Sequence, residues 1–206
     1  MQKRALLLTK EHADKLETLR RNSYHHSQAF VVKNELGLDH YCKWGIDDEA
    51  GIVLGIMTEE DELVSSLRAN IYFDSTSHEA HNEDFEGNTR DFVRYPVLDM
   101  TFAATSPGSF GHGLVSALRY YMYRLHQHTV QSVTGRVVNG SPMFHTLEHL
   151  GYHFKQVDKN REFLKNNDSM LIAVLNAEEL PNAITRLQTK YEDILQEYPL
   201  IIQSTY

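Results

Sequence analysis

The stretch VLDMTFAATSPGSFGHGL, residues 97–114, decides the fold. Its first eight residues, 97–104, combine β-branched and aromatic side chains and predict a strand. Residues 106–113 are small and rich in glycine, and an apolar stripe of helical period then runs from Gly113 to about His128. A strand, a glycine-rich loop and a helix therefore follow one another without interruption.

The loop between this strand and helix is a candidate binding site for a phosphate group. At a helix start several backbone N–H groups lack intrahelical partners, and the helix dipole adds partial positive charge. Glycines at positions 108, 111 and 113 leave room for a phosphate to approach the backbone. A plain turn has the same pattern, and so has a dinucleotide-binding loop. The latter belongs to an early strand–helix–strand unit with an acidic residue about 20 residues further on, and none stands there.

The rest of the chain predicts strands and helices on both sides of this stretch. Towards the C-terminus we expect a strand at 132–138, a helix from Ser141-Pro142 to Gly151, a hairpin of 152–163 and 170–175, and an amphipathic helix at 180–198. Towards the N-terminus we expect a strand at 3–9, one or two helices over 10–36 ending at Gly37, an antiparallel hairpin of 51–58 and 62–73, and a loop or insertion of low order over 75–95. This order predicts a mixed α/β sheet in a single domain, residues 1–206.

Composition excludes several classes of protein. The 20 basic residues are scattered and the formal net charge is -8, which argues against nucleic acid as a partner. Cys42 is the only cysteine, so the chain cannot form an internal disulfide, and no segment approaches the length of a membrane helix. The 12 histidines show no spacing typical of a metal site. We therefore expect a cytoplasmic protein that binds neither a metal nor a membrane.

Two motifs resemble those of the GNAT superfamily of N-acyltransferases. Gly108-x-x-Gly111-x-Gly113 resembles motif A, and LEHLGY at residues 147–152 is similar to motif B. The resemblance covers Val97–Phe154 and implies a mixed, mostly antiparallel central sheet flanked by helices, with residues 180–198 as an extra C-terminal helix. It also implies a site for acetyl-CoA or another acyl-CoA as the acyl donor. The residues implied for that site are Phe102, Ala103, Ala104, Ser109, Phe110, Gly111, His112, Gly113 and Asn139.

The sequence departs from the family pattern at two positions. Gly108 stands where motif A usually has arginine or glutamine, so one side-chain contact to the pyrophosphate is missing. Leu147 stands where motif B often has the tyrosine that serves as general acid, and leucine cannot protonate a leaving thiolate.

A second resemblance lies in the first half of the chain. Asp47-Asp48-Glu49-Ala50 and the later run Glu62–Arg68 resemble the pattern of N-acyl amino acid synthases, whose architecture acyl-homoserine-lactone synthases share. In those enzymes the fourth strand commonly carries an acid followed three residues later by arginine. Here Asp99 matches the acid, and Phe102 replaces the arginine. The resemblance implies a long-chain acyl donor or one carried by acyl carrier protein.

Direct transfer of an acyl group to an amine needs a base and a donor for the thioester oxygen. Strand N–H groups around Phe102–Ala104 could supply that donor. On an alternating strand Asp99, Thr101 and Ala103 would share one face, and Leu98, Met100 and Phe102 the other.

Asp99 is the first candidate for general base or amine-orienting group, and His145 is the next. Arg68 could hold a substrate carboxylate. The alternatives are structural: Asp99 would pair with Arg68 or Arg94, His145 would be packed or exposed, and Arg68 would form an ion pair.

Three functions fit these observations. The first is an N-acyltransferase that moves an acyl group, acetyl in the first instance, from acyl-CoA to the amine of a small molecule. The second is an enzyme similar to the N-acyl amino acid synthases, and the third is a sensor that binds acyl-CoA without catalysis. The helix at 180–198 could mediate homodimerisation or pack on its own sheet.

Overall fold

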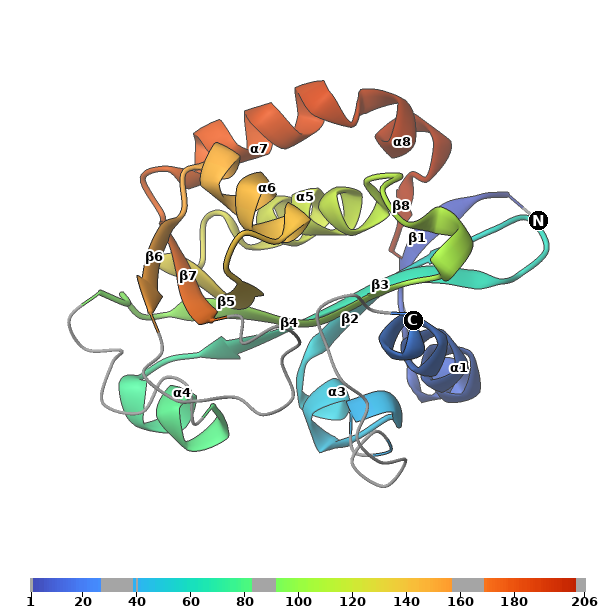
Figure 1. The fold of residues 1–206 in the computed structure, drawn as a ribbon, viewed down its shortest axis with the longest axis horizontal. Coiled ribbons are helices and arrows are strands. Elements are labelled where there is room, and N and C mark those ends of the chain that lie inside the picture. Colours follow the sequence, from blue (N-terminus) through green and yellow to red (C-terminus); the bar gives the residue numbers. More distant parts are fainter. Residues whose placement is uncertain (1, 27–38, 40, 83–91, 157–168, 203–206) are drawn as a thin grey trace.

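A mixed eight-stranded sheet forms the centre of the molecule, and helices cover both of its faces (Figure 1). The computed structural model describes residues 2–26, 39, 41–82, 92–156 and 169–202. Within the sheet β1–β8 and β4–β5 are parallel pairs, and the other five neighbouring pairs are antiparallel. The strands, in spatial order, are β6 (His153–Gln156), β7 (Met170–Asn176), β5 (Ser132–Val138), β4 (Val97–Thr105), β3 (Leu63–Tyr72), β2 (Ile52–Met57), β1 (Arg4–Leu7) and β8 (Leu200–Ile201).

The helices divide between the two faces of the sheet (Figure 1). One face carries α5 (Leu114–His126), α6 (Pro142–Leu150), α7 (Leu180–Lys190) and α8 (Glu192–Glu197). The other face carries α1 (Ala13–His25), α3 (Ile46–Ala50) and α4 (Ser75–His81). The mixed α/β fold class predicted from the sequence is confirmed.

Each face of the sheet has its own apolar packing. On the α5 face Leu98 and Met100 of β4 join a large buried cluster with Leu118 and Met122 of α5. On the α1 face the cluster is smaller, with Val53 and Ala104 packing near Leu16. The α1 face also buries polar residues, which include the candidate site residues Arg68 and Asp99.

The predicted elements in the second half of the chain agree with the structure within a few residues. The strand at 132–138 is β5, and the helix that begins at Pro142 ends at Gly151, whose φ of 97° gives a left-handed C-cap. In the first half, the hairpin is β2 and β3. The predictions over residues 27–38, including Gly37, and over 157–163 lie outside the described residues.

Two of the predicted segments differ from the structure. Residues 75–81 form helix α4 instead of a loop, because the Asp74 carboxylate accepts a hydrogen bond from the Ser77 N–H and caps its start. The expected helix at 180–198 divides at Tyr191 into α7 and α8.

The C-terminal segment packs against its own chain. Leu180, Ala183, Ile184 and Leu187 of α7 are buried in the same apolar cluster as α5, α7 lies over α5 and α6 (Figure 1), and β8 extends the sheet beside β1. No helix in the described ranges is long and apolar enough to cross a bilayer. Nor do three or more His, Cys, Asp or Glu side chains gather as metal ligands among those residues.

Candidate functional site

Strands β4 and β5 pair in parallel and then part. The ladder runs from Val97↔Ser132 to Met100↔Gly135, and β4 continues to Thr105 while β5 continues along β7. At the last pair, a Cβ on Gly135 would lie 3.1 Å from the carbonyl oxygen of Met100, so glycine lets the strands approach closely there. Among the described residues the two strands thus open as a V whose apex is Met100 and Gly135.

A β-bulge in β4 lies just beyond this apex. The register with β3 shifts between Arg68↔Thr101 and Ser66↔Ala104, so two residues of β4 oppose one of β3. Phe102 adopts a left-handed backbone conformation with φ of 50°, which is uncommon for a bulky residue. A bulge leaves backbone groups outside the ladder, and here it does so at the opening of the V.

The bulge also changes which way the following side chains point. The Phe102 ring lies 4.2 Å from the guanidinium carbon of Arg68 and 5.4 Å from that of Arg20, on the α1 face. The expected alternation, with Phe102 on the face of Leu98 and Met100, is therefore wrong. The alternation fails because the bulge at the left-handed Phe102 adds one residue to β4, so the side chains that follow point to the opposite face.

The glycine loop turns from the end of β4 into α5. Gly111 and Gly113 have φ of 81° and 76°, conformations that favour glycine. A Cβ on Gly113 would lie 2.4 Å from the Tyr191 ring, so the contact with the C-terminal helices also requires glycine. No side chain caps α5 at Gly113, and its first N–H groups are therefore available to an anion.

The predicted cofactor-binding residues of the loop differ in whether their backbone N–H groups are already hydrogen-bonded and in how much space surrounds them. The N–H groups of Ser109, Phe110 and His112 donate within the loop, to Ser106, Pro107 and Ser109 at 2.9, 3.5 and 3.3 Å. No heavy atom stands within 4 Å of a Cβ placed on Gly108 or Gly111, so open space lies above both. Asn139 is exposed just after the end of β5, at the open side of the V.

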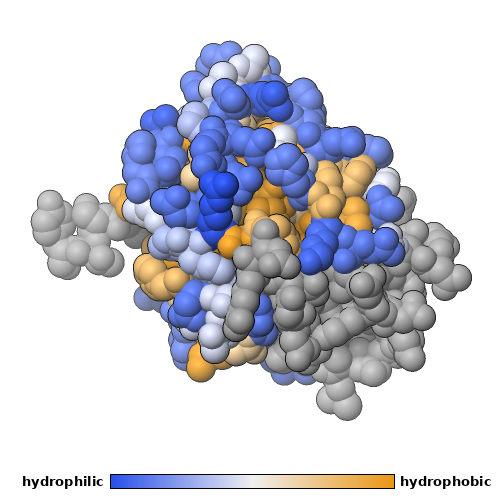
Figure 2. Space-filling view, turned by 90° about the vertical axis from the view of Figure 1, so that its left-hand side faces the viewer, coloured by the Kyte–Doolittle hydropathy of each residue, from blue (hydrophilic) through white to orange (hydrophobic). Residues whose placement is uncertain are grey.

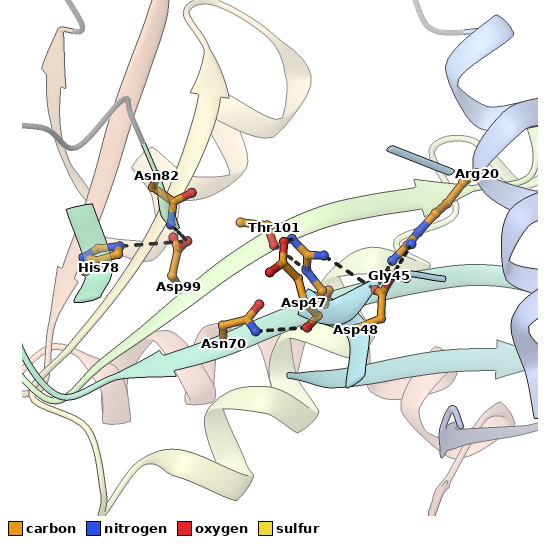
Figure 3. A network of polar contacts seen from close by, with 10 residues as sticks. Arg20, Gly45, Asp47, Asp48, Asn70, His78, Asn82, Asp99 and Thr101 are labelled. Carbon is orange, nitrogen blue, oxygen red and sulfur yellow. Dashed lines mark hydrogen bonds and ion pairs between the residues drawn. The ribbon is translucent and has the colours of Figure 1, made fainter. Parts of the chain in front are cut away.

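Asp99 is buried at the centre of a polar group on the α4 side of the sheet (Figure 3). Its carboxylate accepts hydrogen bonds from Asn82 Nδ2 and Thr134 Oγ1, both at 3.0 Å. His78 Nε2 lies 3.9 Å from the same carboxylate. Burial lowers the pKa of His78 more strongly than Asp99 raises it, which favours a neutral imidazole.

The alternative of an ion pair between Asp99 and Arg68 or Arg94 is not found among the described residues. The Arg94 guanidinium lies 2.5 Å from Glu178 instead. Arg68 Nε donates to Thr101 Oγ1 at 3.1 Å.

Arg68 belongs to a second polar group, which brings together both halves of the Asp47-Asp48…Arg68 pattern. Figure 3 labels the two aspartates of this group. Asp48 forms a bidentate pair with Arg20 of α1 at 2.6 and 3.0 Å, and both side chains are 1% exposed. The terminal nitrogens of Arg68 lie 3.5 Å from Asp47 and 3.7 Å from Asp48. Burial lowers the pKa of Arg68, and the two aspartates oppose it.

His145 is not brought near Asp99. It lies on α6, over the opposite face of the sheet, with 65% of its side chain exposed and with Glu148 at 3.6 Å. Leu147, at the motif B position, is packed in the core at 2% exposure.

Sequence reasoning missed Arg20, His78, Asn82 and Thr134. Arg20 had a weak signal, because it stands one helical turn after the apolar Leu16. For Asn82 and Thr134, the partners of Asp99, the sequence offers no signal.

A separate surface pocket lies at the β6 edge of the sheet. Phe92, Val93 and Val174 line it together with Arg94 and Lys155. Figure 2 shows this side of the molecule, where hydrophobic atoms lie in a hollow between hydrophilic ones. None of the predicted site residues lines this pocket.

Solved structures show where else this fold occurs. No family model matches the sequence, and no curated protein is significantly similar to it. Arabidopsis thaliana NAA60 in complex with acetyl-CoA is 10% identical with a TM-score of 0.59, over 84% of this chain and 98% of that one. The ribosomal-protein-S18-alanine N-acetyltransferase of Escherichia coli is 12% identical with a TM-score of 0.56, over 85% and 94%.

FeeM, an N-acyl amino acid synthase from uncultured soil microbes, has the same fold too. It is 13% identical with a TM-score of 0.55, over 91% of this chain and 99% of FeeM. The chain therefore has the GNAT fold, which the two motifs predicted.

Proposed function

We propose that this protein transfers an acyl group directly from an acyl-CoA to the amine of a small molecule. The observation that carries this function is the V between β4 and β5, with a bulge at Phe102 and an uncapped helix start beside it. The strands part where a thin, extended ligand could lie between them, and the helix start offers N–H groups to a phosphate. NAA60, which has the same fold, has been crystallised in complex with acetyl-CoA.

The donor would be held mainly by backbone groups. The pyrophosphate of CoA would bind at the start of α5, next to Gly111 and Gly113, since Gly108 offers no side chain. The thioester oxygen would accept hydrogen bonds from N–H groups of the bulge at residues 102–104. Asn139 at the end of β5 would close the other side of the V.

The reaction forms one bond and breaks one. The amine nitrogen attacks the thioester carbon, the C–N bond forms, and the C–S bond breaks as the CoA thiolate leaves. Asp99 is the proposed acceptor of the amine proton, with Asn82 and Thr134 fixing its carboxylate. The thiolate takes a proton from water, because Leu147 has none to give.

Binding of the donor is the first test. A ligand present at 100 times its Kd stabilises the folded state by about 2.7 kcal/mol. We expect thermal unfolding to move upwards with acetyl-CoA or with a longer acyl-CoA, and free CoA to appear when amines are added. An unchanged unfolding temperature with every CoA species would overturn the proposal.

The role of Asp99 is tested by Asp99→Asn, which keeps the size of the side chain. We expect kcat/KM for the amine to fall by about 10²- to 10⁴-fold with little change in acyl-CoA binding. His145→Gln is the matched control, because His145 is exposed on the other face. A loss of activity in His145→Gln but not in Asp99→Asn would identify His145 on α6, and not Asp99, as the base.

A second candidate function is the acylation of an amino acid, as in FeeM-like synthases. It is favoured by the distances of 3.5 and 3.7 Å between Arg68 and its two aspartates, which are longer than charge-assisted hydrogen bonds. Arg68 would then bind the carboxylate of the acceptor. Arg68→Gln should raise KM for amino acids at least tenfold and leave KM for simple amines unchanged. Activity with acyl carrier protein as the donor would support it further, whereas binding without turnover would favour a sensor.

A further inference from the structure

Arg119 of α5 is a buried cation in the core between the sheet and α6. Its residue exposure is 6%, and its Nε is buried without a hydrogen-bond partner. Nη1 lies 3.3 Å from the hydroxyl of Tyr152 and 3.4 Å from that of Tyr123. The two terminal nitrogens also contact thioether sulfurs, Nη1 that of Met100 at 3.6 Å and Nη2 that of Met143 at 3.8 Å.

Each of these recorded partners is electrically neutral. Burial raises the pKa of Tyr152 well above its ordinary value, so its phenol stays protonated at neutral pH. Thioether sulfur is a weak acceptor. Removing a cation from water without a counterion is costly, and buried charges are normally paired. The structure therefore leaves the positive charge of Arg119 uncompensated among the residues it describes.

Arg20 of α1, another buried arginine, shows what a compensated site looks like in this chain. Arg20 makes a bidentate pair with Asp48, and both are 1% exposed. The contrast indicates that Arg119 binds an anion other than the side chains that the structure describes.

The guanidinium of Arg119 lies at the apex of the V. Met100 is the last residue of β4 that pairs with β5, and Met143 stands in the first turn of α6. The two sulfurs therefore connect Arg119 to the last paired residue of β4 and to the first turn of α6. Methionine side chains are flexible and adapt readily, so an entering group could displace them.

We propose that the acyl group carried by this protein's donor ends in a carboxylate, and that Arg119 binds it. The inference rests on the proposed acyl-CoA function, in which the acyl group lies in the V near the bulge. Short monothioesters of dicarboxylic acids with CoA, such as succinyl-CoA, have this chemistry. A guanidinium binds a carboxylate through two parallel hydrogen bonds, which two phenols and two thioethers cannot replace. The carboxylate takes no part in the bond changes at the thioester.

The test compares succinyl-CoA with butyryl-CoA, which has the same number of acyl carbons and no charge. Equilibrium binding to the whole chain is measured by calorimetry, and kcat/KM with a fixed amine. We expect tighter binding of succinyl-CoA by about 10- to 100-fold, the usual size of a hydrogen-bonded charge contact. Arg119→Met should reverse the preference, since it replaces the cation with an apolar side chain of similar length.

Two further variants keep the test decisive. Buried charges can often be replaced by apolar groups without loss of stability, so Arg119→Met is expected to fold. Should it not fold, Arg119→Lys keeps the charge but loses the fork, and should reduce the preference for succinyl-CoA at least threefold. Tyr123→Phe removes one neutral partner only and should keep that preference.

The outcomes separate this inference from the proposed function. Equal binding of both thioesters, or an unchanged preference in both Arg119 variants, would overturn the role of Arg119 and leave acyl transfer intact. A protein that binds neither thioester would overturn both.

Discussion

Asp48 is a carboxylate almost without contact with water, and its charge depends on Arg20. Burial alone would raise the pKa of Asp48, but hydrogen bonds and the positive charge of Arg20 outweigh burial, with the Gly45 N–H adding a further hydrogen bond. The pKa of Asp48 therefore lies below its ordinary value. Above the pKa of the unfolded chain the full stabilisation from this pair is present, and it is lost as the pH falls from there through the lowered folded pKa.

At neutral pH, Asp48→Asn should be far more damaging than a change at the next residue. The substitution leaves Arg20 buried without a charge partner, and we expect a loss of about 3–5 kcal/mol in the free energy of unfolding. Glu49→Gln is the matched control, since Glu49 pairs with Lys10 at the surface, where such pairs contribute up to about 1 kcal/mol. Urea unfolding of both variants measures the difference. Losses of equal size would contradict the role given to the buried pair.

At the scale of elements, the sequence predicts best where one local pattern is sufficient. The strand at β5 and the helix between Pro142 and Gly151 follow from their own residues, and the structure agrees. The left-handed Phe102 could not be predicted, because the stacking of two arginines on its ring depends on α1 and β3. Helix α4 was missed because its apolar content is low and a single cap at Asp74 starts it.

The candidate site also combines residues that a local sequence pattern predicts with residues that only the folded chain brings together. Motif A, the pair Asp47-Asp48 and Arg68 can be read along the chain, and the structure joins Asp47-Asp48 to Arg68. Arg20 stands 28 residues from Asp48 in sequence, so only tertiary folding brings them together. The same holds for Asn82 and Thr134 around Asp99.

The glycine loop offers a prediction at this scale through two glycines with matched surroundings. A Cβ on Gly108 or on Gly111 would meet no atom within 4 Å, but only Gly111 has a positive φ, of 81°. Gly111→Ala should therefore cost about 1–2 kcal/mol from backbone strain, and weaken acyl-CoA binding as the loop shifts. Gly108→Ala should change neither quantity by more than about 0.5 kcal/mol. Thermal unfolding with and without acetyl-CoA measures both, and equal effects of the two substitutions would show that loop conformation is unimportant.

At the scale of the whole molecule the sheet separates two environments. The α5 face is predominantly apolar and holds the uncompensated Arg119, whereas the α1 face holds the buried charges around Asp48 and Asp99. The V between β4 and β5 opens between these environments. A donor held from the α5 side and an amine delivered from the α1 side would meet at the bulge, which is the arrangement that direct transfer needs.

The histidines of the two faces give the molecule a predictable response to pH. Burial lowers the pKa of His78 on α4 and of His126 at the end of α5. In the unfolded chain these imidazoles titrate near pH 6.5, so below that pH the unfolded state binds more protons than the folded state. The free energy of unfolding should therefore decrease as the pH falls from about 7.5 to 5.5, a range above the titration of ordinary carboxyl groups.

Removing one buried histidine should remove part of this pH dependence. Urea unfolding at both pH values is compared for the native chain, for His78→Gln, and for His145→Gln, whose side chain is largely exposed. His78→Gln should show a smaller difference between the two pH values because it has one fewer proton to gain on unfolding, whatever its absolute stability. His145→Gln should keep the full difference. An undiminished difference in His78→Gln would mean that His78 accepts a proton within the folded protein, which would make it, beside Asp99, a rival for the amine proton.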